Sequence, residues 1–172
     1  MTGLERNADL VTMSCYAPLF GHEEAWQWRP NLIWFDNLQS YGTANYYAQK
    51  LFSLHHGDRQ LATTIENAPE ITANKQGLHA SATLHKKSGE VIIKVVNITD
   101  AELRANVVLH GVGQVGTPAK VILLRSDSLD DENTLQEPKK IYPQESTATF
   151  STPNFTYDFQ SLSLTVLRVP VK

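Results

Sequence analysis

The sequence has almost no cysteine and no surplus of positive charge, and these absences exclude several classes of function. Cys15 is the only cysteine among 172 residues, which excludes an internal disulfide and a metal site built from cysteines. The formal net charge is −3, so the chain lacks the basic field that holds a nucleic acid. No apolar run approaches the roughly 20 residues that a membrane-spanning helix needs. Because Cys15 has apolar neighbours, we expect it to be buried as a small apolar side chain.

The first residues lack the basic, apolar and small-residue layout of a signal peptide. Residues 4–9 are typical of the last turns of a helix, so we expect that the chain was cut from a longer one. An apolar run at residues 11–20 follows, and Pro18 ends it. This order predicts a strand buried on both faces, as in parallel sheets. Its backbone groups need partners. We therefore expect the chain either to dimerise or to pack this segment over the rest of the protein.

Aromatic residues are concentrated between residues 26 and 57. Aromatic side chains have large apolar surfaces, so such a cluster needs a cover. Two interpretations are open, namely a helix packed in the core or the wall of a sugar-binding cleft. Residues 21–29 are typical of a polar loop, and a helix is predicted to begin after it with Asn31 as its N-cap. The aromatic residues of the stretch include Trp26, Trp28, Trp34, Phe35, Tyr41, Tyr46, Tyr47 and Phe52.

A second helix is predicted after Tyr-Gly at residues 41–42. Thr43 is a suitable N-cap for it. Tyr47, Leu51 and Leu54 follow helical spacing and form one apolar stripe. Gly57 is placed to end the helix as the residue after its C-cap. We expect Tyr46, Tyr47 and Phe52 to be core contacts of this helix.

After residue 58 the apolar period changes to two, which indicates strands. Ser88 and Gly89 separate two such runs and predict a hairpin turn. Short strands with turn signals at this spacing are typical of a β-sandwich or jelly roll. The predicted strands are residues 78–84, 90–97, 103–109, 119–125, 147–150, 155–159 and 163–169.

The change of period divides the chain into two parts, residues 1–57 and residues 58–172. The first part is too short to be a domain, and its predicted helices and single apolar strand suit a piece of an α/β fold. The fold class is therefore mainly β, a jelly-roll-like antiparallel β-sandwich preceded by a short α/β remnant.

No constellation of side chains in the sequence predicts catalysis or a cofactor. Cleavage of a glycosidic bond commonly needs two carboxyl groups roughly 5–10 Å apart. None of the candidate acidic residues forms a convincing pair, and residues 130–132 are typical of a turn or solvated surface. The histidines lack the spacing of a zinc helix, so we expect no metal and no cofactor. The acidic candidates are Glu5, Glu23, Glu24, Asp36, Asp130, Asp131 and Glu132.

Long motifs resemble the α-L-arabinofuranosidases of glycoside hydrolase family 51. The end of that family's catalytic barrel is similar to LERNADLVTMSCYAPLF, RPNLIWFDN and YGTANYYAQKLFS. Its C-terminal β-sandwich is similar to SATLHKKSGEVIIKVVN, LRSDSLDDENTLQEPKKIYP and YDFQSLSLTVLRV. The resemblance extends from Leu4 to Val169.

This resemblance implies a (β/α) barrel with two catalytic glutamates, followed by a jelly-roll domain. Such enzymes remove terminal arabinofuranose from arabinan and arabinoxylan, polysaccharides of the plant cell wall, with retention. Both glutamates would precede Met1. We therefore expect this chain to contain no catalytic residue and to be inactive. Residues 1–57 would be the barrel remnant. An extracellular or periplasmic location would suit the whole enzyme.

The resemblance also indicates which residues face the sugar. Active sites of such barrels lie at the C-terminal ends of the strands, and the loop after residues 11–19 opens on that side. Trp26, Trp28 and Asn31 are therefore candidate substrate-binding residues. Alternatively, the sandwich is an autonomous carbohydrate-binding module that uses Phe155, Tyr157 and Phe159, although we expect these three rings to be core.

Overall fold

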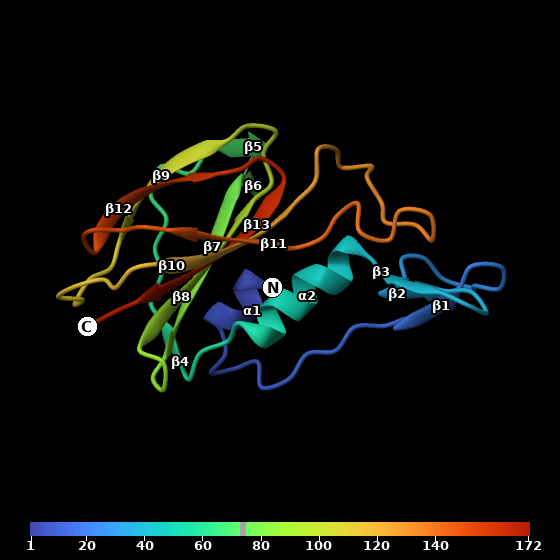
Figure 1. Ribbon diagram of the computed structural model, residues 1–172, viewed down its shortest axis with the longest axis horizontal. Coiled ribbons are helices and arrows are strands. Elements are labelled where there is room, and N and C mark those ends of the chain that lie inside the picture. Colours follow the sequence, from blue (N-terminus) through green and yellow to red (C-terminus); the bar gives the residue numbers. More distant parts are fainter. Residues whose placement is uncertain (73–74) are drawn as a thin grey trace.

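The computed structural model describes residues 1–72 and 75–172, and most of its regular structure is β (Figure 1). Its elements are α1 (Thr2–Arg6), β1 (Phe20–His22), β2 (Ile33–Phe35), β3 (Ser40–Gly42), α2 (Ala44–Leu54), β4 (Arg59–Leu61), β5 (Glu70–Thr72), β6 (Lys75–Gln76), β7 (Leu78–His85), β8 (Glu90–Asn97), β9 (Leu103–Val108), β10 (Ala119–Arg125), β11 (Gln144–Ala148), β12 (Asn154–Phe159) and β13 (Ser163–Pro170).

An antiparallel sandwich forms the core of the protein. Its larger sheet has the strand order β11-β10-β13-β8-β7-β4, and β12 pairs with β9 in a second sheet. Alternate side chains of β7, β8 and β13 pack against Phe155 and Phe159 of β12 and against Phe150. The prediction of a mainly β, antiparallel sandwich is confirmed.

The predicted strands after residue 78 agree closely with the observed ones. Gly89 lies in the β7–β8 hairpin with φ of +64°, a conformation that glycine adopts without strain. One strand was placed too late, because β11 begins at Gln144 and ends at Ala148. Phe150 lies beyond β11 and is buried in the core.

Helix α2 covers the outer face of the six-stranded sheet. Thr43 is its N-cap and accepts a hydrogen bond from the backbone N–H of Tyr46 at 3.2 Å, as predicted. Tyr47, Leu51 and Phe52 are buried in a cluster with side chains of β8, β10 and β13. The expected core role of the aromatic residues of this helix is confirmed.

The predicted end of this helix was wrong. Helix α2 ends at Leu54 with His55 as its C-cap, and the Leu54 side chain is 60% exposed rather than part of the buried stripe. Gly57 has a different function, because a Cβ at this position would lie 2.6 Å from the carbonyl oxygen of Leu84. Glycine therefore allows the chain to pass close to β7.

The predicted buried strand at residues 11–20 was also wrong. Only Phe20 belongs to a strand, and Leu10, Met13 and Leu19 are exposed, as is Cys15. Among the described residues, the backbone of this segment meets a strand neighbour only at its end, where Leu32 and Ile33 donate to the carbonyls of residues 18 and 19. A strand buried on both faces needs neighbours along its whole length.

A hairpin takes the place of the helix predicted after residue 30. Strands β2 and β3 pair antiparallel, so Asn31 is not an N-cap. Ile33, Trp34 and Phe35 favour extended structure because they are β-branched or aromatic. Asp36 fixes the turn, since its Oδ1 accepts hydrogen bonds from the backbone N–H groups of Leu38 and Gln39 at 2.7 and 2.6 Å. These backbone hydrogen bonds also lower the pKa of Asp36.

Helix α1 ends at Arg6, three residues before the predicted end at residue 9, and packs on β7. The Arg6 guanidinium donates to the Ala80 carbonyl at 2.9 Å. In Figure 1, α1 and α2 lie next to each other over the larger sheet. Neither they nor any other helix within residues 1–72 and 75–172 has the length and apolar character required to cross a membrane.

Candidate functional site

The small sheet β1-β2-β3 carries the residues that the sequence indicated as candidates. Strand β1 pairs parallel with β2, and β2 pairs antiparallel with β3. Figure 1 shows this sheet at one end of the molecule, beyond the N-terminal end of α2. Residues 23–32 connect β1 to β2, and we call them the tryptophan loop because they carry Trp26 and Trp28.

The two tryptophans of this loop expose their rings. Trp28 is 70% exposed and Trp26 is 47% exposed, whereas Trp34 of β2 is buried at 3%. The Trp26 ring packs edge-to-face on Trp34 with centroids 5.9 Å apart. The Arg29 guanidinium lies 5.3 Å from the centre of the Trp34 ring. The tryptophan loop therefore packs against the buried ring of Trp34.

Asn31, the third candidate, lies inside the loop. Its side chain is buried at 2% and its Nδ2 donates to the Trp28 carbonyl at 2.6 Å. Gly21 makes room for it, because a Cβ there would lie 2.5 Å from Asn31 Nδ2. The structure thus brings all three candidates together, with two rings outside and the amide bracing the loop.

Several of the acidic candidates near this sheet make contacts within the protein. Glu23 accepts a hydrogen bond from the Tyr41 hydroxyl at 2.7 Å. Burial raises the pKa of Tyr41, and the hydrogen bond to Glu23 raises it further, so Tyr41 stays a neutral donor. Glu132 pairs with Arg29 at 2.5 Å, and both side chains are exposed. The contact with Lys140 lowers the pKa of Asp131 to about 2.

Glu5, another acidic candidate, belongs to α1 and its side chain contacts the six-stranded sheet. Its carboxylate is paired with Lys94 and accepts a hydrogen bond from the Ser81 hydroxyl at 2.5 Å. No group of three or more metal-ligating side chains occurs within the described ranges 1–72 and 75–172.

Asn133 is the residue at this site that the sequence did not indicate. It lies in the connection between β10 and β11 (residues 126–143) and is buried at 3%. Its Nδ2 donates to the Gly42 and Ile141 carbonyls, at 2.9 Å in both cases. A cavity of about 170 Å³ lies between this connection and the small sheet, beside their contact. Its lining includes Arg29, Trp34 and Asn133. An asparagine within an acidic, turn-like stretch gives no signal of such a contact.

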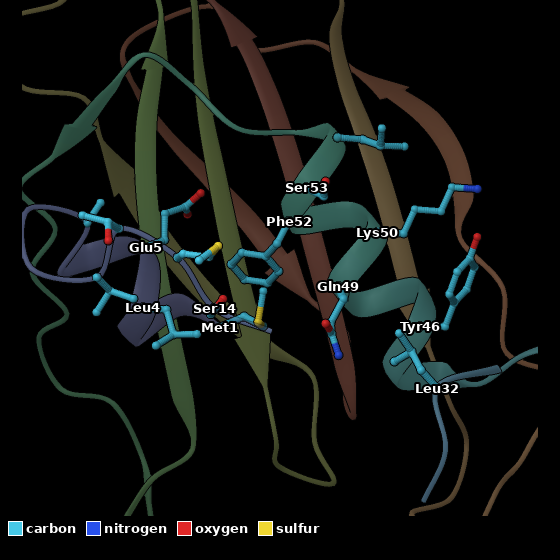
Figure 2. A pocket seen from close by; sticks show the side chains of 15 residues that line it. Met1, Leu4, Glu5, Ser14, Leu32, Tyr46, Gln49, Lys50, Phe52 and Ser53 are labelled. Carbon is cyan, nitrogen blue, oxygen red and sulfur yellow. The ribbon is translucent and has the colours of Figure 1, made fainter. Parts of the chain in front are cut away.

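A second, open groove of about 610 Å³ lies between α2 and the first 14 residues. Figure 2 shows Phe52 reaching from α2 into this space, with Leu4 and Glu5 of α1 on the opposite side. The exposed segment before β1 contributes Val11, Thr12 and Met13 to its lining. The groove is thus bounded on one side by the apolar segment 11–19, which among the described residues meets a strand neighbour only at its end.

Comparisons with known proteins agree on one family. Residues 1–163 match the family described as "Alpha-L-arabinofuranosidase C-terminal domain". Alpha-L-arabinofuranosidase 1 of Arabidopsis thaliana is 34% identical over 152 residues, which are 85% of this chain and 21% of that protein. The chain therefore spans about a fifth of the length of this relative.

Two solved structures contain a region with the same fold as this chain. The arabinose-bound MgGH51 α-L-arabinofuranosidase superposes with a TM-score of 0.89 at 32% identity, covering 100% of this chain and 26% of that one. The α-L-arabinofuranosidase of Thermotoga maritima, also an arabinose complex, has a TM-score of 0.83 at 22% identity, over 97% of this chain and 36% of that one. With the family match over nearly its whole length, the chain belongs to the C-terminal domain family of the α-L-arabinofuranosidases.

Proposed function

We propose that this chain serves as the C-terminal part of a retaining α-L-arabinofuranosidase. The enzyme would release terminal arabinofuranose from arabinan and arabinoxylan of plant cell walls. The match of residues 1–163 to the family carries this proposal, because it includes the small sheet and every strand of the sandwich before β13. Within the chain, residues 1–57 would be the end of the catalytic barrel and residues 58–172 the sandwich domain.

The chain by itself would not be catalytic. Retention requires a nucleophile and an acid/base carboxyl group about 5 Å apart. Glu5 and Glu23 are occupied by Lys94 and Tyr41 respectively. The two glutamates would come from barrel strands outside this sequence, and the sandwich would support the barrel.

We infer that the tryptophan loop forms one wall of the arabinose pocket. Trp26 and Trp28 expose flat rings on which a furanose can stack, with the polar edge of the indole free to donate a hydrogen bond. Asn31 would contribute by holding the loop through its bond to the Trp28 carbonyl.

Structural support is favoured over an autonomous carbohydrate-binding module. Such a module needs exposed rings on a sheet face, but Phe155 and Phe159 are buried and Tyr157 packs with them in the core. Tyr142 is 37% exposed, and its ring packs against Tyr47. A single partly covered ring is a poor platform for a polysaccharide.

We also propose that the isolated chain associates with itself through residues 10–19. Leu10 and Met13 are 77% and 87% exposed, and apolar side chains grouped in this way favour contact with another surface. Sedimentation velocity should show dimers or larger species at micromolar concentration. A monodisperse monomer in which these amides exchange rapidly would contradict this.

An assay with an aryl α-L-arabinofuranoside tests the main proposal. The chain should release no phenol, whereas the same chain within its full-length polypeptide should do so. In that longer protein, Trp28→Ala should raise KM about tenfold or more through lost stacking, and Tyr142→Ala should leave it unchanged. Turnover by the isolated chain that a point substitution abolishes would overturn the proposal.

Affinity electrophoresis separates support from binding. Mobility of the chain in gels containing arabinan or arabinoxylan should match that in plain gels. Retardation that is lost on Tyr157→Ala would instead favour the binding module.

A further inference from the structure

The connection between β10 and β11 links the sandwich to the tryptophan loop. Figure 1 shows this connection, in orange, leaving the sandwich and extending toward the small sheet at the end of the molecule. The link is made by two contacts. Asn133 donates to the Gly42 carbonyl of β3, and Glu132 pairs with Arg29 of the loop.

Asn133 makes the stronger of the two contacts. Its two Nδ2 hydrogens are shared between the Gly42 and Ile141 carbonyls, and its Oδ1 accepts from the Ile141 N–H at 2.7 Å. This pattern fixes the amide, because the flipped orientation would place Oδ1 against two carbonyl oxygens. Arg29 and Glu132 are 48% and 61% exposed, so their ion pair contributes little.

The contact at Gly42 is transmitted to the tryptophans through the sheet. Gly42 is the register partner of Ile33, and Tyr41 is the partner of Trp34. The next residue, Thr43, donates to the Leu32 carbonyl with both its N–H and its hydroxyl. Moving Gly42 would therefore move β2, including Trp34, on which Trp26 packs.

We propose that Asn133 is a positioning residue that holds the tryptophan loop against the sandwich. This inference rests on the proposed function, and it gives the sandwich a defined part in shaping the sugar pocket beyond general support. The sandwich holds β3 through Asn133, and β3 holds β2 with its Trp34. Trp26 and Arg29 in turn pack against the Trp34 ring.

Fluorine NMR of the chain labelled with 5-fluorotryptophan tests the coupling directly. The three tryptophans give three signals, which single Trp→Phe variants assign. Asn133→Ala should shift or broaden the signals of Trp26 and Trp34. Amide exchange in β2 and β3 should become about tenfold faster, because a buried carbonyl loses its donor.

Asn97→Ala is the matched control. Asn97 is also fully buried, and its Nδ2 donates to three backbone carbonyls, among them those of Ala101 and Phe159. This variant should lower the unfolding midpoint but leave the tryptophan signals in place. If Asn133→Ala lowers the midpoint to the same extent and also leaves the three signals unchanged, the inference is wrong.

Asn133→Asp adds a reversible test, because the number of donors at this position then changes with pH. Its carboxylate keeps the acceptor for the Ile141 N–H but faces the Gly42 carbonyl without a hydrogen. Burial raises the pKa of an aspartate carboxyl group, and protonation restores one donor. The perturbed signals should therefore return toward those of the unsubstituted chain as the pH is lowered from about 8 to about 5. Signals equal to those of the unsubstituted chain at pH 8 would contradict the coupling. No sugar or turnover is involved, so this outcome is separate from that of the arabinoside assay.

Discussion

Lys94 is fully buried, and its environment shows how α1 is held on the sandwich. The side chain lies on the outer face of β8, pairs with the Glu5 carboxylate of α1, and has the Phe52 ring 5.0 Å from its ammonium group. Burial lowers the pKa of Lys94, and the contact with Glu5 opposes that shift. A charge in this position is stable only while its partner is present.

Removing one partner should therefore cost more than removing both. We predict that Glu5→Ala destabilises the chain by about 3 kcal/mol, because Lys94 is left buried and unpaired. The double variant Glu5→Leu with Lys94→Met should be within about 1 kcal/mol of the unsubstituted chain. Urea denaturation measures both. A double variant as unstable as Glu5→Ala would show that the pair itself supplies the stability.

His55 makes stability depend on pH. Burial lowers the pKa of His55 to about 4, and the charge of Arg168, 3.3 Å away, acts in the same direction. The unfolded chain binds the proton near pH 6.5 while the folded chain does not, so stability falls as pH drops from 6.5 to 4. Because His55 is only half buried, we expect a loss of about 1–2 kcal/mol.

His55→Gln should reduce this pH dependence, since glutamine can still accept a hydrogen bond from Arg168 but does not titrate. Unfolding midpoints measured between pH 4 and pH 6.5 provide the test. His56→Gln, a change at the exposed neighbour, is the control and should leave the slope as it was. Equal slopes for the His55 variant and the unsubstituted chain would refute the assignment.

Both leucines of α2 were predicted to lie on one apolar stripe, but the structure buries only one of them. Leu51 is 4% exposed and Leu54 is 60% exposed. We predict that Leu51→Ala costs about 2–4 kcal/mol, because it leaves a cavity against the sheet. Leu54→Ala should cost less than about 0.5 kcal/mol. Urea denaturation of the two variants gives the comparison, and similar losses would mean that the helix is rotated from its described position.

Elements stabilised by neighbours in sequence could be predicted, and those stabilised by distant contacts could not. The β7–β8 hairpin and the cap at Thr43 depend on residues a few positions apart, and both are confirmed. Residues 11–19 have strand composition, but a buried strand depends on neighbours that the described chain does not supply along its length. The β2–β3 hairpin is an exception to this rule. Its turn is local, because Asp36 accepts hydrogen bonds from the backbone two and three residues later, yet a helix was predicted there.

The candidate site shows the same limit. The family resemblance indicated Trp26, Trp28 and Asn31, and the three candidates do lie together. Asn133 could not be found, because its contact with Gly42 joins residues 91 positions apart. Lys94 was one lysine among several scattered ones, and its partner Glu5 is 89 positions away.

At the scale of the whole molecule, the protein has three layers rather than the two of a sandwich. The six-stranded sheet buries its inner face against β9 and β12 and its outer face against α2. The part of the outer face under α2 is apolar, and its buried apolar side chains are Ile92, Ile122, Leu124, Leu164 and Val166. Lys94 is buried on the same face. A polar outer face would be expected of a sandwich that meets water on that side.

The sandwich alone should therefore not be stable in water. We predict that residues 58–172 bind a hydrophobic dye and aggregate, because removal of α2 exposes this apolar face and Lys94 together. Residues 43–172 are the control, since they keep α2 with its cap and should unfold cooperatively, although less stably than the whole chain because Lys94 loses Glu5. Dye fluorescence and calorimetry distinguish the two. If residues 58–172 form a cooperative monomer, α2 is an accessory to the sandwich and not its third layer.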